Sequence, residues 1–390
     1  MLTLLLIIIY LAFISLGLPD SLLGSAWPAM QPDLAVGISS AGIIFMIISF
    51  GTIVSSLFSG RLIRKFGTGK LTFVSVTMTA AALLGFSVSP SFIWLCIMAV
   101  PLGLGGGAVD ASLNNFVALH YKAKHMSWLH CFWGVGATLG PIIMSLFIYN
   151  NNQWKKGYLT IAIIQFCLVF ILLITLPLWK KVEKKYAKIS FDAKSTNDTN
   201  VFKIPGVKLA LVSFVFYCAT ESTAGLWGSS YLVNYKGLLP GRAARWISLF
   251  YGGITLGRLL SGFLTMKLNN RILIRLGQIM CIIGAICLIL PLPIYFSMIG
   301  LIFVGLGCAP IYPCMLHETP KRLGTSSSQS IMGIQMGFAY MGSMFMPPIL
   351  GYVASKTSIS IFPYFLLCCM LIMLLGSEKI NKFIRKRNLA

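Results

Sequence analysis

Three carboxylic acids lie deep inside long apolar stretches of the sequence: Asp20, Asp110 and Glu221. An acid in apolar surroundings is costly unless it has a partner or a purpose, and it can bind and release a proton when its solvation changes. Asn114 follows Asp110 by four residues, which places both side chains on one face of a helix. These residues predict a site that exchanges protons. The structural alternative is that each acid only fastens two helices by hydrogen bonding.

Polar and aromatic residues in the same stretches could bind a polar solute. Trp133 follows His130 by three residues, so both lie on one helix face. An indole can stack on the C–H face of a sugar ring, and a histidine can bind a hydroxyl or relay a proton. Core packing is the alternative for each tryptophan. The predicted solute-binding residues are Asn114, Asn115, His130, Trp133, Trp227, Tyr312 and Gln335.

The elements that carry these residues are long and apolar. The chain has 390 residues, of which 57% are hydrophobic and 10% charged, and its mean hydropathy is +0.84. These values predict an integral membrane protein. Apolar runs long enough to cross about 30 Å of hydrocarbon recur twelve times, and we expect the first to be a retained helix and not a signal peptide. The predicted spans are 2–29, 38–60, 69–89, 93–120, 127–149, 157–179, 206–232, 244–264, 272–291, 294–316, 327–352 and 359–376.

The chain is strongly basic, with 31 Lys and Arg and a net charge of +22. Most of these residues fall in alternate loops, so the positive-inside rule predicts that both termini are cytoplasmic. The basicity therefore reflects membrane topology, and we expect a lipid bilayer and no nucleic acid as partner.

No catalytic or metal-binding pattern is present in the sequence. The ten cysteines are scattered through apolar runs without metal or redox spacing. The "GLGGG" at 103–107 lacks the strand and the downstream acid of a dinucleotide site, and close helix packing explains it better. We therefore expect a protein that is not an enzyme and has no cofactor and no metal.

The two halves of the chain align at a constant offset of 202 residues, as in Gly51 with Gly253 and Gly103 with Gly305. The sequence thus predicts an all-α membrane protein with twelve transmembrane helices in two pseudo-symmetric bundles. The predicted parts are a bundle at 1–179, a cytoplasmic linker at 180–205, a bundle at 206–376 and a basic cytoplasmic tail at 377–390.

Two tandem six-helix halves joined by a basic loop resemble the major facilitator superfamily. The stretch "GRLIRKFGTGK" at 60–70 is similar to that family's loop between helices 2 and 3. Arg64 stands where the family has an aspartate that caps and latches the inward-closed state. The residues carried over to this gating loop are Gly60, Arg64, Lys65, Gly67 and Lys70.

Four further stretches look like the fucose permease-like sugar:cation symporters. They are "DASLNNF" at 110–116, "FYCATESTAGLWGSSYLVNY" at 216–235, "IYPCM" at 311–315 and "MPPILGYVAS" at 346–355. The resemblance implies that acids in the first and fourth helices couple proton movement to sugar binding, a role that falls on Asp20 and Asp110. Glu221 joins them as a third expected proton-coupling residue.

We therefore expect a monomeric secondary transporter of the bacterial cytoplasmic membrane that imports a sugar or polyol-like solute by alternating access. Its coupling ion is expected to be a proton in preference to sodium. Two alternatives stay open: a proton-coupled efflux antiporter for drugs or other lipophilic compounds, and a receptor or scaffold that binds a solute without flux.

Overall fold

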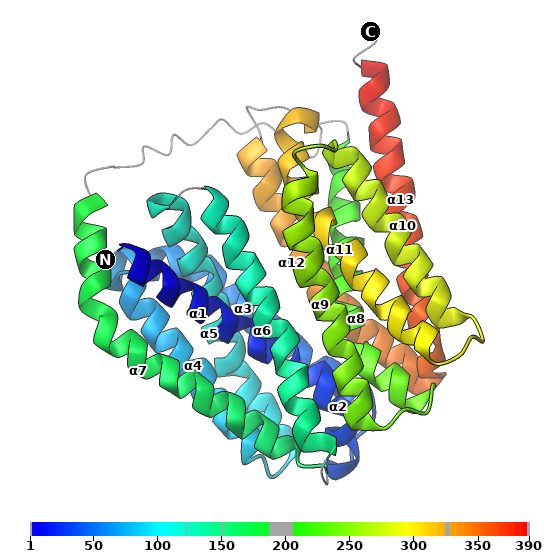
Figure 1. The fold of residues 1–390 in the computed structure, drawn as a ribbon, viewed down its shortest axis with the longest axis horizontal. Helices are drawn as coiled ribbons and strands as arrows, with labels where there is room; N and C mark the ends of the chain where they lie inside the picture. Colours follow the sequence, from blue (N-terminus) through cyan, green and yellow to red (C-terminus); the bar gives the residue numbers. More distant parts are fainter. Residues whose placement is uncertain (1, 122, 150–151, 187–205, 324–327, 388–390) are drawn as a thin grey trace. The chain divides into compact units, whose positions relative to one another are not determined.

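The computed structural model describes residues 2–121, 123–149, 152–186, 206–323 and 328–387, which form helices and no strand (Figure 1). The predicted all-α class is confirmed, and each predicted span falls on helical residues, the first of them on two consecutive helices. The helices are α1 (Leu2–Asp20), α2 (Leu22–Asp33), α3 (Ser40–Phe66), α4 (Thr68–Ser87), α5 (Phe92–His120), α6 (Ala123–Tyr149), α7 (Trp154–Tyr186), α8 (Val207–Asn234), α9 (Pro240–Leu264), α10 (Asn270–Ile289), α11 (Tyr295–Leu323), α12 (Ser328–Lys356), the 3₁₀ turn η2 (Ile359–Ile361) and α13 (Phe362–Arg387).

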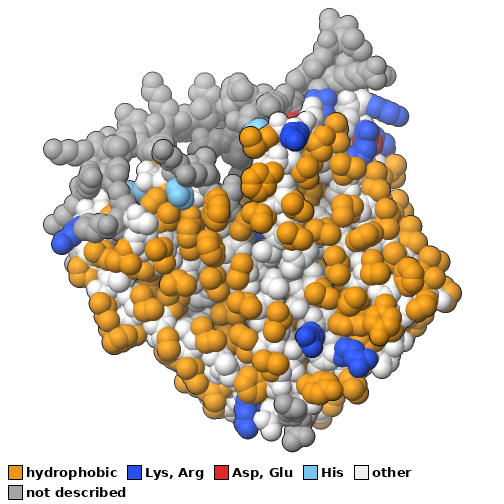
Figure 2. Space-filling view, in the orientation of Figure 1, with side chains coloured by type: hydrophobic (Ala, Val, Ile, Leu, Met, Phe, Trp, Pro, Cys, Tyr) orange, Lys and Arg blue, Asp and Glu red, His pale blue; other side chains and the backbone are white. Residues whose placement is uncertain are grey.

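Eleven segments of the described residues are long and apolar enough to cross a membrane. The first of them, Thr3–Asp33, joins α1 and α2, and α12 is the helix outside the eleven. Hydrophobic side chains cover most of the face in Figure 2, with isolated Lys and Arg side chains between them. An exposed apolar surface of this kind suits hydrocarbon and not water.

The chain divides into two compact units. Unit 1 comprises residues 1–191 and 229–248, and unit 2 comprises residues 192–228 and 249–390. The boundaries predicted for the two bundles, the linker and the tail stay predictions. The predicted linker begins within α7, which continues to Tyr186, and its residues 187–205 lie outside the described residues.

The repeat seen in the sequence recurs as the same packing inside each unit. In unit 1 a Cβ added at Gly105 would lie 2.6 Å from the Ser75 carbonyl oxygen, and in unit 2 a Cβ at Gly307 would lie 2.5 Å from that of Gly277. Gly103 likewise packs on the carbonyl of Ile48, and Gly305 on that of Phe250. Each residue in these unit 1 contacts stands 202 positions before its counterpart in unit 2. Small residues therefore let the helix backbones approach closely at equivalent points of the two units.

The first span is broken beside Asp20. α1 ends at that residue, Ser21 forms a turn, and α2 begins at Leu22. Pro19 supplies no backbone N–H for the helix ladder, and the Ser21 hydroxyl donates to the Leu18 carbonyl at 3.2 Å. Gly17 and Pro19 both weaken the helix before Asp20, which accounts for a break at this point.

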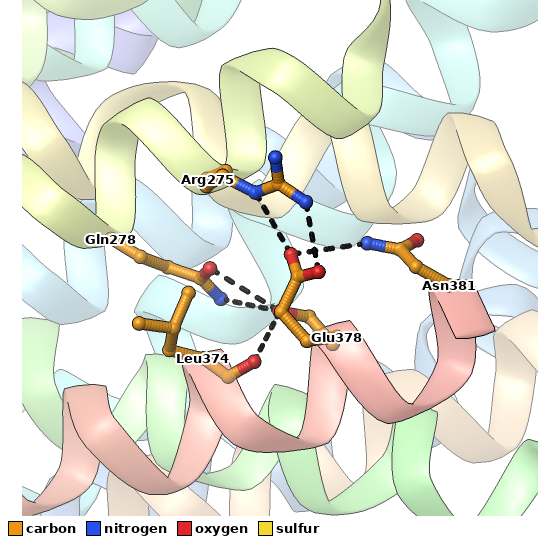
Figure 3. Close-up of polar contacts among 6 residues, drawn as sticks. Arg275, Gln278, Leu374, Glu378 and Asn381 are labelled. Carbon is orange, nitrogen blue, oxygen red and sulfur yellow. Dashed lines mark hydrogen bonds and ion pairs between the residues drawn. The ribbon is translucent and has the colours of Figure 1, made fainter.

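Polar contacts join α10 to α13 in unit 2 (Figure 3). Arg275 donates to both carboxylate oxygens of Glu378, at 2.9 and 2.8 Å. Gln278 and Ser377 are hydrogen bonded one turn away, at 3.2 Å. These contacts hold the polar ends of two long helices together, while their remaining turns are apolar.

Candidate functional site

Asp20 lies near the middle of the 31-residue span Thr3–Asp33, and its side chain is exposed. The indole N–H of Trp133 on α6 donates to its Oδ2 at 2.8 Å. α1 and α6 touch closely here, because a Cβ on Gly17 would meet the Trp133 backbone and Ala137 N at 2.8 Å. A predicted proton-coupling residue, Asp20, is therefore in direct contact with a predicted solute-binding residue, Trp133.

Asp110 on α5 is the second acid of unit 1. Asn114 donates its amide N–H to the Asp110 Oδ1 at 2.9 Å, as the spacing of four residues predicts. The Asp110 carboxylate also lies close enough to Asp20 to interact with it electrostatically. Asn115 is exposed on the same helix. Unit 1 thus brings together two carboxyl groups whose hydrogen-bond donors, an indole and an amide, are neutral.

His130 lies one turn before Trp133 on α6. Its ring meets the Phe13 ring edge-on, with ring centroids 6.0 Å apart. Nearer the start of the same two helices, a hydrogen bond of 2.8 Å joins the Tyr10 hydroxyl to His125 Nδ1. The sequence pattern did not select Tyr10 or His125.

Glu221 on α8 is the acid of unit 2, and it has a cation beside it. Arg258 Nη2 on α9 lies 3.3 Å from its Oε1, and the Tyr217 hydroxyl donates to its Oε2. About a fifth of each charged side chain is exposed (18% for Arg258 and 19% for Glu221). The structure thus pairs Arg258 with an acid of the neighbouring helix.

The remaining predicted residues of unit 2 lie at different places. Tyr312 packs its ring against Tyr217, with centroids 5.8 Å apart, and so adjoins the Glu221 group. Trp227 is fully buried and donates its indole N–H to the Pro347 carbonyl at 2.8 Å. Gln335 is also buried and accepts a hydrogen bond of 2.9 Å from Thr319. In this conformation Trp227 and Gln335 pack inside unit 2, and Tyr312 is half-buried.

Sequence inspection missed Arg258 and Tyr217 as partners of Glu221. Two signals were available. Arg258 lies deeper in its predicted span than any other Lys or Arg does, and charged groups in membranes usually pair with one another. Tyr217 precedes Glu221 by four residues, so both lie on one helix face.

Of the predicted gating loop, only Gly67 lies outside a helix, between the end of α3 and the start of α4. Its φ of 79° is in the region that favours glycine. Arg64 and Lys65 are exposed in the last turn of α3, Gly60 is exposed on that helix, and Lys70 is exposed on α4. Among the described residues no carboxylate pairs with Arg64, so the family's aspartate latch has no counterpart in this part of unit 1.

Comparisons with known proteins agree on one family. A family model described as Major Facilitator Superfamily matches residues 9–347. The chain is 23% identical to "Bypass of stop codon protein 6" of Saccharomyces cerevisiae, over 94% of this chain and 80% of that protein. It is 25% identical to the "Glucose/mannose transporter GlcP" of Bacillus subtilis, over 79% of this chain and 77% of that protein. The solved structure of the nucleoside transporter NupG matches with a TM-score of 0.76 at 14% identity, over 96% of this chain and 98% of that chain.

Proposed function

Because the chain belongs to the Major Facilitator Superfamily, we propose that it imports a small neutral sugar or polyol-like solute together with protons, by alternating access. The chain is a multi-pass membrane transporter and not an enzyme. The family match and the sugar transporter among its relatives support the solute class. We place it in the bacterial cytoplasmic membrane, as a monomer with both termini in the cytoplasm.

The acid pair of unit 1 is the observation that carries this proposal. Asp20 is exposed in mid-span, and its carboxylate interacts with that of Asp110. The hydrogen-bond donors of the two acids are neutral groups, the indole of Trp133 for Asp20 and the amide of Asn114 for Asp110, and not fixed cations. A change of solvation during the transport cycle can then load and unload a proton.

A neutral polar solute suits the groups beside this pair. Trp133 offers an indole face, and Asn114 and His130 offer hydrogen-bonding groups to hydroxyls. In unit 2 the charge of Glu221 is compensated by Arg258, so this guanidinium is already paired with a carboxylate. We assign Glu221 a smaller part in proton exchange than Asp20 and Asp110, and Asn115, Trp227, Tyr312 and Gln335 remain proposed solute contacts of other conformations.

The first experiment identifies the solute. Purified protein is screened by thermal shift against sugars, polyols, nucleosides and amphipathic drugs at two pH values, because a ligand that binds the folded state raises its melting temperature. Uptake of the stabilising compound into proteoliposomes is then measured with an inward proton gradient, and with a sodium gradient in its place. Proton-driven uptake supports the proposal.

Asp110→Asn tests the coupling itself. We expect this variant to bind the solute but to lose solute-driven proton uptake, because an amide cannot carry the exchanged proton. Asp33→Asn is a matched control, since Asp33 also accepts an asparagine amide N–H, that of Asn152 at 3.3 Å, but at the end of its helix. Unaltered proton coupling in Asp110→Asn contradicts the assignment. Expulsion of a dye from the proteoliposomes would favour the efflux antiporter. Binding of a solute without flux would favour the receptor.

A further inference from the structure

The interface between α1 and α6 carries titratable groups at three levels. Asp20 meets Trp133 at the far level, His130 lies against Phe13 at the middle level, and Tyr10 is hydrogen bonded to His125 at the level nearest the N-terminus. On α1 the residues Tyr10, Phe13, Gly17 and Asp20 follow one another at intervals of three or four, so they form one stripe of the helix. The three levels therefore lie in a row along one interface.

Apolar packing separates these levels. Ala12 and Phe13 have no exposed surface, and Leu16 is 8% exposed. Tyr10 lies about 15 Å from Asp20 along the helix axis, at 1.5 Å per residue. A proton cannot cross this distance in one hydrogen-bond step, so the half-buried imidazole of His130 is the titratable group that divides it.

We propose that protons pass between Asp20 and the N-terminal end of unit 1 along the α1–α6 interface, through His130 and the His125–Tyr10 pair. The proposal rests on the proposed function, in which Asp20 exchanges protons. The basic loops predict that this end of the unit is cytoplasmic, so the route would release imported protons into the cell.

Each transfer in this route is balanced. An imidazole accepts a proton at one ring nitrogen and gives one up from the other, so it returns to neutral with only its tautomer changed. The steps from Asp20 to His130 and from His130 to His125 require intervening water, which the proposal includes, and Asp20 at one end of the route is exposed. His125 is faced by the hydroxyl of Tyr10 from α1 and by the ring of Tyr121 from the end of α5, whose centroid is 5.8 Å away.

The third histidine of this region has another arrangement and serves as a control. His120 Nδ1 contacts the Phe116 carbonyl of its own helix, α5, at 2.8 Å, and its ring stacks on Phe116. It lies near the same end of unit 1 but outside the stripe on α1. A substitution of His120 therefore changes a histidine without interrupting the row.

The test follows protonation of Asp20 directly and needs no solute. The full chain in lipid nanodiscs is subjected to a pH jump, and carboxyl protonation is recorded by time-resolved infrared absorption. The band of Asp20 is the one that Asp20→Asn removes. We expect His130→Ala to slow its protonation by roughly 10- to 100-fold, which is the scale of a lost proton-transfer group, and added imidazole to restore the rate.

His125→Gln separates a relay from a structural contact. Glutamine can keep a hydrogen bond to Tyr10 but cannot exchange a proton, so we expect slower protonation with an unchanged equilibrium titration of Asp20. His120→Gln should leave the rate as in the parent protein. Equal rates in the parent, His130→Ala and His125→Gln would overturn the route. If no band is lost in Asp20→Asn, the proposed proton site is itself wrong, and the route falls with it.

Discussion

Asp20 in unit 1 and Glu221 in unit 2 occupy equivalent positions with different partners. Gly136 packs on the carbonyl of Ile14 in unit 1, and Gly342 packs on that of Val215 in unit 2. Val215 follows Ile14 by 201 positions, as Glu221 follows Asp20. Asp20 accepts a neutral indole N–H, whereas Glu221 lies beside a guanidinium.

The source of that difference is a position on the neighbouring helix. Arg258 stands 202 residues after Ser56, whose hydroxyl donates to the Gly107 carbonyl at 3.2 Å. One unit therefore has a small hydroxyl where the other has a fixed positive charge. A carboxylate beside a cation keeps its charge, and one with neutral partners can change it. The packing of the two units is alike at these points, and we propose that the different partners of the two acids make Asp20 and not Glu221 the proton-exchanging one.

The largest expected effect comes from neutralising each acid in turn. Asp20→Asn should reduce uphill uptake of the identified solute by about 100-fold or more while exchange persists, because a proton-exchanging group typically contributes a factor of this order. Glu221→Gln should retain proton-driven uptake. Both are measured as solute uptake and as exchange in proteoliposomes. Equal losses in the two variants would remove the functional distinction between the units.

The next effect is on stability. Arg258→Ala leaves the Glu221 carboxylate without its cation and should lower the free energy of unfolding by about 3 kcal/mol, since breaking a largely buried pair exposes the cost of the remaining charge. Ser56→Ala, at the equivalent position, should have a small effect. The double variant Arg258→Ala with Glu221→Gln should recover part of the loss. Denaturant unfolding measures all three, and a silent Arg258→Ala would show that the pair is unimportant.

The smallest expected effect is on stability, and it tests the glycine contacts that the two units share. Gly105→Ala and Gly307→Ala each place a Cβ within 2.6 Å of a backbone carbonyl oxygen, and overpacking of this kind costs about 1–3 kcal/mol. We expect similar losses in the two variants, measured by denaturant unfolding. Gly262→Ala is the control, because a Cβ there has no neighbour within 4 Å. A large difference between the two variants would show that equivalent packing does not mean equivalent stability.

Much of the fold was predictable because its signals are local. A membrane span needs only an apolar run of sufficient length, so the spans matched the helices. The repeat was visible in glycines, since only glycine fits the contacts at Gly103 and Gly305.

The site was less predictable because its contacts join residues far apart in the sequence. The pair of Asp110 and Asn114 was visible through helical spacing. The bond from Trp133 to Asp20 and the pair of Arg258 with Glu221 depend on how helices are rotated about their axes, and a nearly uniform apolar sequence leaves that rotation undefined. For the same reason, the sequence did not show that Trp227 and Gln335 point into the packing of unit 2.

The contacts at Gly103 and Gly305 also bear on how such a chain can diverge in evolution. They fix the helix spacing through backbone atoms alone, so the polar side chains one or two turns away contribute little to it. Asp110 and Tyr312 stand at equivalent positions of the two units, as do Ser56 and Arg258, and the shared backbone tolerates both choices. A duplicated half can therefore exchange an acid for a phenol, or a hydroxyl for a cation, and acquire a new specificity without inventing a new scaffold.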